Sequence, residues 1–253
     1  MRIVRPPLAL RKLYPDLTWR RSIEERKLFL TFDDGPVPVA TDFVLDTLRD
    51  FHIKGTFFCV GENVLKNPRI YHRILNEGHA VGNHTHNHLK GWQTSDGVYL
   101  KNVADCELAL LNGKNSGSAG LRLEGERLKE ERLKEERLDG VVLEGEGEKL
   151  ETGDVGKWEK LAKPLFRPPY GRIKRSQMKA LLPDYQIIMW DVLSYDYDKR
   201  ISPEQCLKHV VSKVRPGSIV VFHDHVKAFQ NLSYALPRAL EILVKDGWTF
   251  GVL

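Results

Sequence analysis

The sequence predicts an α/β protein whose strands form a parallel, barrel-like sheet. Short apolar runs alternate along the chain with amphipathic segments, a pattern typical of strands and helices that follow one another in such a sheet. Polar clusters come directly after several of the runs, at the strand ends where parallel sheets carry their functional side chains. The 253 residues, 42% of them hydrophobic, suffice for one large domain.

About seven strands are expected. Each is a short apolar run that glycine or a polar cluster ends, as Gly35-Pro36 breaks the chain soon after the first and Gly61 ends the second. The predicted strands cover 27–30, 55–60, 79–82, 165–166, 186–190, 218–222 and 248–253.

The segments between the strands predict helices. Phe43, Val44 and Leu48, for example, lie on one face of a helix at the 3.6-residue period, and Gly78 is a typical residue to end a helix. The predicted helices cover 41–51, 64–77, 95–111, 177–182, 203–214 and 234–245.

Two segments lie outside this alternation. Residues 1–25 are basic and rich in proline, and we expect an arm that packs on the outside of the domain. Residues 113–156 form a charged, low-complexity insertion with a five-residue Arg-Leu-Lys-Glu-Glu repeat. A leucine every five residues makes no continuous apolar face, which favours a surface insertion, helical or disordered, over a coiled-coil partner site.

Composition limits the function classes. The formal charge of +5 and the pI near 9.0 are mild, and no basic run is interleaved with aromatic residues, so nucleic acid is not an expected partner. The three cysteines, Cys59, Cys106 and Cys206, predict buried reduced thiols. We find no signal peptide and no apolar run long enough to span a membrane. The sequence alone thus favours a soluble, cytoplasmic monomer.

An adjacent acid pair, Asp33 and Asp34, follows the first strand. Two like charges this close disfavour joint ionisation unless a cation lies nearby. The same residues, followed by Gly35-Pro36, would also suit an ordinary turn.

Three histidines follow the third strand. His84 and His88 share one side of a helical turn, whereas His84, His86 and His88 share one face of an extended segment. A histidine pair alone is more often structural, but Asp34, His84 and His88 together would make a three-ligand site with a position open for water, the arrangement of a catalytic zinc.

Five motifs, in order, resemble those of the polysaccharide deacetylase family, also called the NodB homology domain or carbohydrate esterase family 4. They are Thr31-Phe32-Asp33-Asp34-Gly35-Pro36, His84-Thr85-His86-Asn87-His88, Arg167-Pro168-Pro169-Tyr170, Ser194-Tyr195-Asp196-Tyr197 and Val221-Phe222-His223-Asp224. The resemblance implies a single domain over 1–253 with a distorted (β/α) barrel. It also implies metal-dependent removal of acetyl groups from a glycan, such as peptidoglycan or N-acetylglucosamine oligomers, with Zn²⁺ or Co²⁺ as the metal.

The resemblance also implies roles for single residues. Asp34, His84 and His88 would hold the metal, and Asp33 would be the general base. Arg167 would orient Asp33, and the backbone N–H of Tyr170 would stabilise the oxyanion. His223 would be the proton donor, supported by Asp196.

Alternatives stay open for several of these residues. Arg167 could form a salt bridge at the rim, Asp196 could be a turn residue, and Asp191 could be the partner of His223 instead. His86 could replace a metal ligand. Tyr197 stands where the family often has tryptophan, which leaves the shape of the substrate groove open.

Two other functions compete with glycan deacetylation. One is hydrolysis of a non-glycan amide or ester by the same machinery, and the other is carbohydrate binding without activity. Glycan deacetylation also points to the cell envelope, in conflict with the cytoplasmic location that the sequence favours.

Overall fold

The computed structural model describes residues 3–21, 24–115 and 163–253. The predicted insertion over 113–156 therefore lies, except for its first three residues, outside the described residues. No helix in the described ranges is both long and apolar enough to cross a membrane. Cys59, Cys106 and Cys206 are buried and form no disulfide, as predicted.

The strands form one parallel sheet in the order β5-β4-β3-β2-β1-β7-β6, and β8 also pairs with β1. This parallel half-barrel confirms the predicted α/β fold, a distorted (β/α) barrel. The strands are β1 (Lys27–Asp33), β2 (Thr56–Cys59), β3 (Ala80–Asn83), β4 (Leu165–Phe166), β5 (Gln186–Ile187), β6 (Val192–Leu193), β7 (Ile219–His223) and β8 (Thr249–Gly251).

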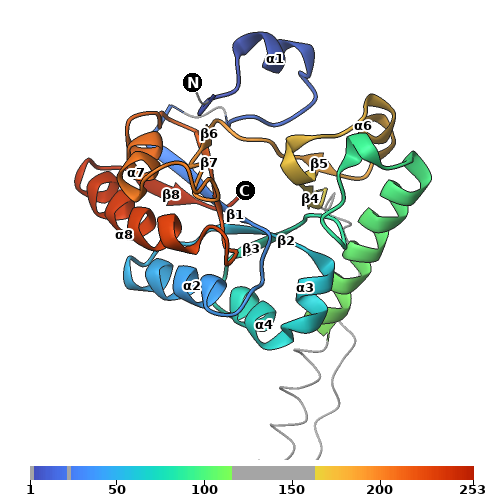
Figure 1. Ribbon diagram of the computed structural model, residues 1–253, viewed down its shortest axis with the longest axis horizontal. Coiled ribbons are helices and arrows are strands. Elements are labelled where there is room, and N and C mark those ends of the chain that lie inside the picture. The colour runs from blue at the N-terminus through green and yellow to red at the C-terminus, as the bar shows by residue number, and fades with distance from the viewer. Residues whose placement is uncertain (1–2, 22–23, 116–162) are drawn as a thin grey trace, which may run out of the picture. The chain divides into compact units, whose positions relative to one another are not determined.

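Helices surround the strands, as Figure 1 shows for α2, α4, α7 and α8. They are α1 (Leu8–Leu13), α2 (Ala40–Asp50), α3 (Gly61–Lys66), α4 (Pro68–Asn76), α6 (Arg175–Leu181), α7 (Pro203–Val211) and α8 (Phe229–Lys245), with a further helix whose described part covers 96–115. Two short 3₁₀ turns, η1 (Gly91–Gln93) and η2 (Pro169–Gly171), lie in the loops.

Three predicted elements differ from the structure. The helix expected over 64–77 is two helices, because Asn67 leaves helical geometry (φ −130°, ψ 55°) before Pro68, as residues that precede proline commonly do. The strand expected over 186–190 pairs with β4 only at Gln186 and Ile187. Helix α8 begins at Phe229 rather than at 234 and continues through Pro237.

The central strand β1 is buried on both faces, which is typical of parallel sheets covered by helices. The ring of Phe32 stacks on Phe57 of β2 and lies near Phe222 of β7, with ring centroids 5.0 and 6.3 Å away. Asp33 follows Phe32 directly and is the last residue of the strand. Asp33 is therefore attached directly to the buried core.

The amino-terminal segment contributes more than the outer arm that the sequence predicted. Thr18 pairs with the chain just after β5: its N–H donates to the carbonyl of Ile187, and its own carbonyl accepts from the N–H of Met189. Leu17 and Trp19 are buried in a cluster with Phe166 and other core residues. Part of the arm is therefore core, because it extends the pairing beyond β5.

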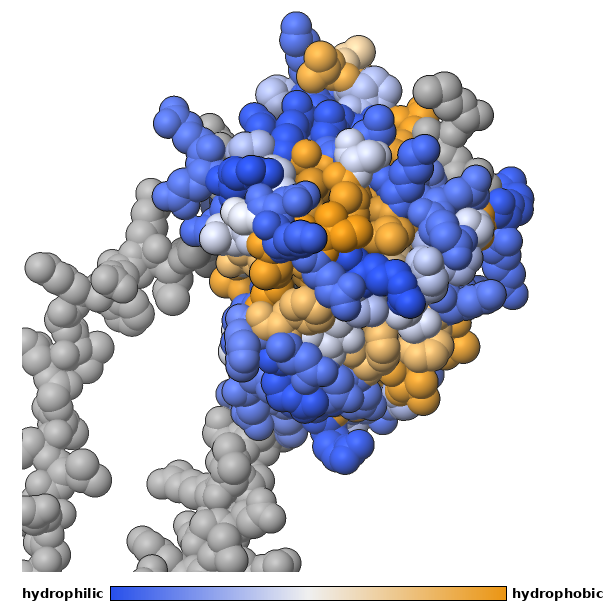
Figure 2. Space-filling view, turned by 90° about the vertical axis from the view of Figure 1, so that its left-hand side faces the viewer, coloured by the Kyte–Doolittle hydropathy of each residue, from blue (hydrophilic) through white to orange (hydrophobic). Residues whose placement is uncertain are grey.

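The surface mixes polar and apolar side chains. Figure 2 shows one face on which hydrophobic residues emerge between hydrophilic ones. Single exposed apolar residues, such as Ile242 and Val244 of α8, are normal on soluble domains.

Candidate active site

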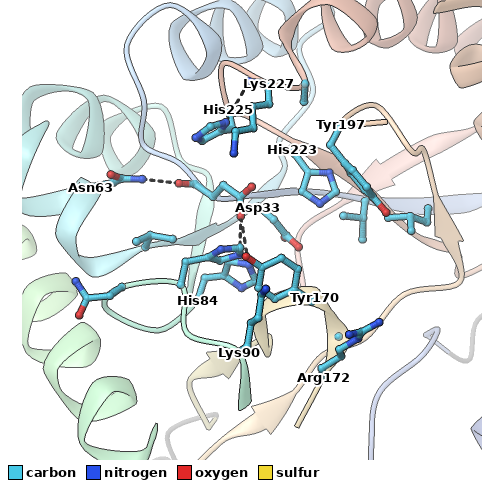
Figure 3. A pocket seen from close by; sticks show the side chains of 18 of the residues that line it. Asp33, Asn63, His84, Lys90, Tyr170, Arg172, Tyr197, His223, His225 and Lys227 are labelled. Atoms are coloured by element: carbon cyan, nitrogen blue, oxygen red, sulfur yellow. Dashed lines mark hydrogen bonds and ion pairs between the residues drawn. The ribbon is translucent and has the colours of Figure 1, made fainter. Parts of the chain in front are cut away.

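The sheet register brings the site together. Asp33, at the end of β1, is in register with His223, at the end of β7. Asn83, at the end of β3, is in register with Phe166 of β4, so that His84 and Arg167 follow at the same edge. Asp33 and His223, 190 positions apart in the sequence, thus meet at the carboxyl edge of the sheet, where Figure 3 shows them with His84 around one pocket.

Asp34, His84 and His88 form a cluster that could hold a metal ion. One ligand atom from each lies within 4.8 Å of the others. The Oδ1 atom of Asp34 is 3.5 Å from Nε2 of His84 and 3.1 Å from Nε2 of His88. The sequence predicted this trio.

The bonding of the cluster fits a divalent cation. Oδ1 of Asp34 is buried and accepts no hydrogen bond from any residue that the structure describes. Nδ1 of His84 lies 2.8 Å from the carbonyl oxygen of Arg167. Since a carbonyl can only accept, Nδ1 carries a proton, and Nε2 is the ring nitrogen that faces the carboxylate. A divalent cation could lie between Nε2 and Oδ1 once Nε2 carries no proton, and the carbonyl partner of Nδ1 is the usual support of a metal-binding histidine.

Asp34 stays ionised in this setting. Burial acts to raise the pKa of its carboxyl, but the nearby imidazoles of His84 and His88 and the charge of His223 outweigh burial and hold the pKa well below the usual value. His86 is not part of the cluster, because its Nδ1 packs against Gly61. The structure thus does not support His86 as a replacement ligand.

Asp33 is paired with a fully buried arginine. Nη1 of Arg167 donates to Oδ1 of Asp33 at 2.6 Å and to Oγ1 of Thr31 at 2.7 Å. Nη2 of Arg167 donates to the carbonyl of Met189, and the guanidinium lies over the ring of Phe58. Arg167 has no exposed surface, so the alternative of a salt bridge at the rim is wrong.

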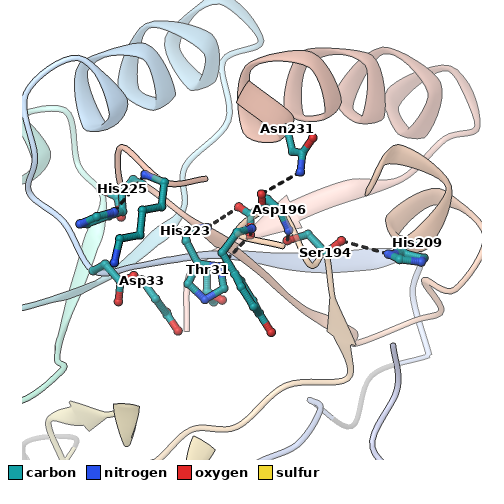
Figure 4. Close-up of polar contacts among 12 residues, drawn as sticks. Thr31, Asp33, Ser194, Asp196, His209, His223, His225 and Asn231 are labelled. Carbon is teal, nitrogen blue, oxygen red and sulfur yellow. Dashed lines mark hydrogen bonds and ion pairs between the residues drawn. The ribbon is translucent and has the colours of Figure 1, made fainter. Parts of the chain in front are cut away.

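His223 is paired with Asp196. Oδ1 of Asp196 lies 2.8 Å from Nδ1 of His223, and its Oδ2 accepts the backbone N–H of the same residue at 2.7 Å (Figure 4). Burial acts to lower the pKa of His223, but Asp196 outweighs it and raises the pKa to about 9. The ring of Tyr197 packs edge-on against the imidazole.

The other candidate partner, Asp191, is bound elsewhere. Its buried carboxylate accepts hydrogen bonds from Arg11, Arg215 and Ser218 at 2.5 to 3.1 Å, and Arg5 lies 3.5 Å away. The structure therefore resolves the choice that the sequence left open in favour of Asp196.

One buried acid near the site was not given a role from the sequence. Asp224 accepts from Oγ1 of Thr41 at 2.6 Å and from the N–H of Gly35 at 3.1 Å, and its own N–H donates to the carbonyl of Asp33. Burial raises the pKa of its carboxyl well above the usual value. Its position directly after His223 in the fifth motif could have indicated from the sequence that it lies at the site. Asp224 ties the loop of the acid pair to α2 and to the end of β7.

The cluster, Asp33 and His223 line one cleft of about 650 Å³. Aromatic and basic residues complete its wall: Tyr170, Trp190, Tyr197, Lys90, Arg172, His225 and Lys227. Tyr170 is 53% exposed, has a positive φ of 60°, and places its ring 4.7 Å from that of His88. The cleft therefore brings Asp33, His223 and the Asp34, His84 and His88 cluster together at one place.

The fold and the site are together those of a hydrolase built on a parallel α/β half-barrel. The family model described as polysaccharide deacetylase matches residues 20–115. A peptidoglycan-N-acetylglucosamine deacetylase of Bacillus cereus is 32% identical over 240 residues, which cover 92% of this chain and 89% of that protein. The chain belongs to the polysaccharide deacetylase family.

Two further relatives agree with this membership. Chitin deacetylase 2 of Saccharomyces cerevisiae is 26% identical over 226 residues, which cover 85% of this chain and 55% of the yeast protein. A crystal structure of a peptidoglycan N-acetylglucosamine deacetylase, in complex with 4-naphthalen-1-yl-N-oxidanyl-benzamide, superposes with a TM-score of 0.73 at 25% identity and covers 98% of this chain and 95% of that one. The chain is thus an enzyme of the polysaccharide deacetylase class, as its motifs predicted.

Proposed function

We propose that the enzyme removes acetyl groups from the N-acetylglucosamine residues of a peptidoglycan-type glycan. The names of its relatives in Bacillus cereus support this substrate. The observation that carries the proposal is the arrangement of the cleft, in which the Asp33–Arg167 and His223–Asp196 pairs lie beside the Asp34, His84 and His88 cluster. A protein that only binds carbohydrate has no need of a base and a proton donor at one point.

Asp34, His84 and His88 would hold the metal, and zinc or cobalt(II) suits one carboxylate and two imidazoles. When bound, the metal would polarise the acetyl carbonyl and make water a better nucleophile near neutral pH. The backbone orients one of these ligands, because the carbonyl of Arg167 accepts a hydrogen bond from His84.

Asp33 would accept the proton of the attacking water as the oxygen bonds to the acetyl carbon. The guanidinium of Arg167, 2.6 Å from Asp33, would keep the carboxylate ionised and oriented. The backbone N–H of Tyr170, at the wall of the cleft, would donate to the oxygen that becomes negative.

His223 would complete the reaction. Its pKa of about 9 keeps the imidazole protonated near neutral pH, so it can donate a proton to the nitrogen as the carbon–nitrogen bond breaks. Acetate and a free amino sugar would leave. Asp196 would stabilise the protonated imidazole until that step.

The test is acetate release from peptidoglycan fragments and N-acetylglucosamine oligomers, with zinc or cobalt(II) present. We expect Asp33→Asn to bind metal as the unaltered enzyme does and to lose about a hundredfold or more in turnover, the range for general base catalysis. Asp16→Asn, which changes an exposed acid outside the cleft, is the matched control.

Two results would contradict the proposal in different ways. Unchanged acetate release by Asp33→Asn would remove Asp33 from the mechanism. No release from any glycan, with metal demonstrably bound, would instead point to a non-glycan amide or ester as substrate.

A further inference from the structure

Three basic side chains at the wall of the cleft have no acidic partner among the described residues. Lys90, Arg172 and Lys227 are exposed and line the cleft. The acids of the same wall are already engaged: Asp33 pairs with Arg167 and Glu62 with Lys66, while Asp34 belongs to the metal cluster. The entrance therefore carries a surplus of positive charge even before a cation is bound.

Aromatic rings position two of these cations without neutralising them. Nζ of Lys90 lies 5.4 Å from the ring centre of Tyr170, and the guanidinium of Arg172 lies 5.2 Å from that of Trp92. The indole of Trp92 is itself fixed by a hydrogen bond to the carbonyl of Ile173. A cation held over a ring keeps its full charge for a ligand.

The three cations stand on both sides of the reacting point. Figure 3 shows Lys90 and Arg172 on the side of Tyr170, and Lys227 on the opposite side beside His225, with Asp33 between them. The backbone N–H of Lys227 donates to Nδ1 of His225, which fixes the backbone position from which the Lys227 side chain extends. A glycan that crosses the cleft would thus pass between positive groups.

We propose that Lys90, Arg172 and Lys227 form a carboxylate-binding subsite that selects acidic glycans over neutral ones. This inference rests on the proposed deacetylation and names its substrate class more narrowly. Arginine binds a carboxylate through two parallel N–H groups, and lysine adds a point charge. Muramic residues carry a lactyl group whose carboxyl is a free carboxylate where the stem peptide has been removed, whereas a chitin chain carries no charge. The positive electrostatic potential of the cleft would also raise the association rate of a negatively charged glycan.

The test compares one glycan in two charge states. A peptidoglycan-derived N-acetylglucosamine–muramic acid oligomer is used as the free acid and as its methyl ester, and kcat/KM is measured for both. We expect the enzyme to prefer the acid about tenfold or more at low salt, because its charge-assisted hydrogen bonds are lost in the ester. This preference should fall as salt screens the charges.

Variants then assign the preference to these residues. Combined Lys90→Gln, Arg172→Gln and Lys227→Gln should bring the acid-to-ester ratio close to one. The matched control removes three positive charges elsewhere, through Lys179→Gln, Lys208→Gln and Lys245→Gln, at exposed positions outside the cleft. It should keep the ratio of the unaltered enzyme.

Equal kcat/KM for acid and ester, or an unchanged ratio in the cleft variant, would overturn the subsite. Calorimetric titration of both oligomers into Asp33→Asn separates this result from a failure of the proposed function. If the unaltered enzyme releases no acetate, but Asp33→Asn binds the acid oligomer more tightly than the ester, the subsite is supported and the proposed reaction is contradicted. Equal binding of the two oligomers would overturn the subsite whatever the turnover.

Discussion

Arg167 carries its charge without any exposed surface, and its neighbours explain how this is possible. Asp33 supplies the opposite charge, while Thr31 and the carbonyls of Ile188 and Met189 accept further hydrogen bonds from the guanidinium. A buried ion pair is tolerated when its hydrogen bonds are satisfied in this way. Arg167 thus fixes Asp33 on the side that faces the core, while Asp33 also lines the cleft.

The pairing of His223 with Asp196 leads to a prediction about pH. Burial lowers the pKa of His223, but Asp196 raises it further, to about 9. We therefore expect Asp196→Asn to bring this pKa down toward or below the ordinary value near 6.5. NMR titration of the imidazole in the metal-free protein measures the change. Asp198→Asn, which removes a nearby acid that pairs with Arg200, should leave the pKa of His223 near 9.

The same pair predicts the pH dependence of stability. Because the folded pKa of His223 lies above its unfolded value, the pair stabilises the folded protein fully below about pH 6.5, and this contribution is lost as pH rises through about 9. The difference in free energy of unfolding between the unaltered protein and Asp196→Asn should therefore narrow over this range. Denaturant unfolding at a series of pH values checks it, and a difference that widens would contradict the assignment.

Single residues of the site could be predicted from the sequence to different extents. Asp34, His84 and His88 could be chosen together, because metal ligands have a restricted chemistry and spacing. The choice between Asp191 and Asp196 could not be made, since both follow the same apolar run. Asp191 is occupied by Arg5 and Arg11, which reach it from the amino-terminal segment. The sequence around Asp191 gives no sign of contacts with residues so far away.

Among the elements, the loop that follows β1 and carries Asp34 is held in place by Asp224. Asp224, the residue directly after β7, bonds to Gly35 and to Thr41 of α2. The loop after β1 is thus held from two directions. A β-carbon at Gly35 would come within 2.0 Å of Oδ2 of Asp224, so no larger residue fits without moving the loop.

We predict that Gly35→Ala destabilises the protein and weakens metal binding. Overpacking of this kind typically costs about 1–3 kcal/mol, and the displaced loop carries Asp34. Thermal unfolding and a competitive zinc titration measure the two effects. Gly97→Ala is the matched control, because a β-carbon at Gly97, within the helix over 96–115, meets nothing within 4 Å. Equal zinc affinity of Gly35→Ala and the unaltered protein would show that Asp224 does not position the ligand.

Most elements could be predicted from apolar periodicity, and the exceptions have tertiary causes. The run over 186–190 is apolar enough for one strand, but Thr18 takes the pairing position beside Ile188. Helix α8 begins five residues before the apolar pattern becomes regular, and Leu232 of this first part packs in the core. Neither contact can be read from a local window.

For the molecule as a whole, residues 1–113 and 163–253 make one compact unit that contains the sheet and the complete candidate site. We therefore predict that replacing 117–153 by a short glycine-serine linker keeps folding and metal binding. Circular dichroism, the unfolding temperature and zinc stoichiometry check this prediction. A shortened chain that is insoluble, or that binds no zinc, would show that the insertion belongs to the core.

The backbone bond between His84 and Arg167 sets an order for biosynthesis. All three predicted metal ligands precede Arg167 and His223 in the chain and therefore leave the ribosome before them. The carbonyl that orients His84 is added 83 residues later, and His223 follows later still. A nascent chain can therefore present the ligands long before their geometry is fixed. The completed enzyme, rather than the emerging fragment, would be the species that discriminates among the metals of the cell.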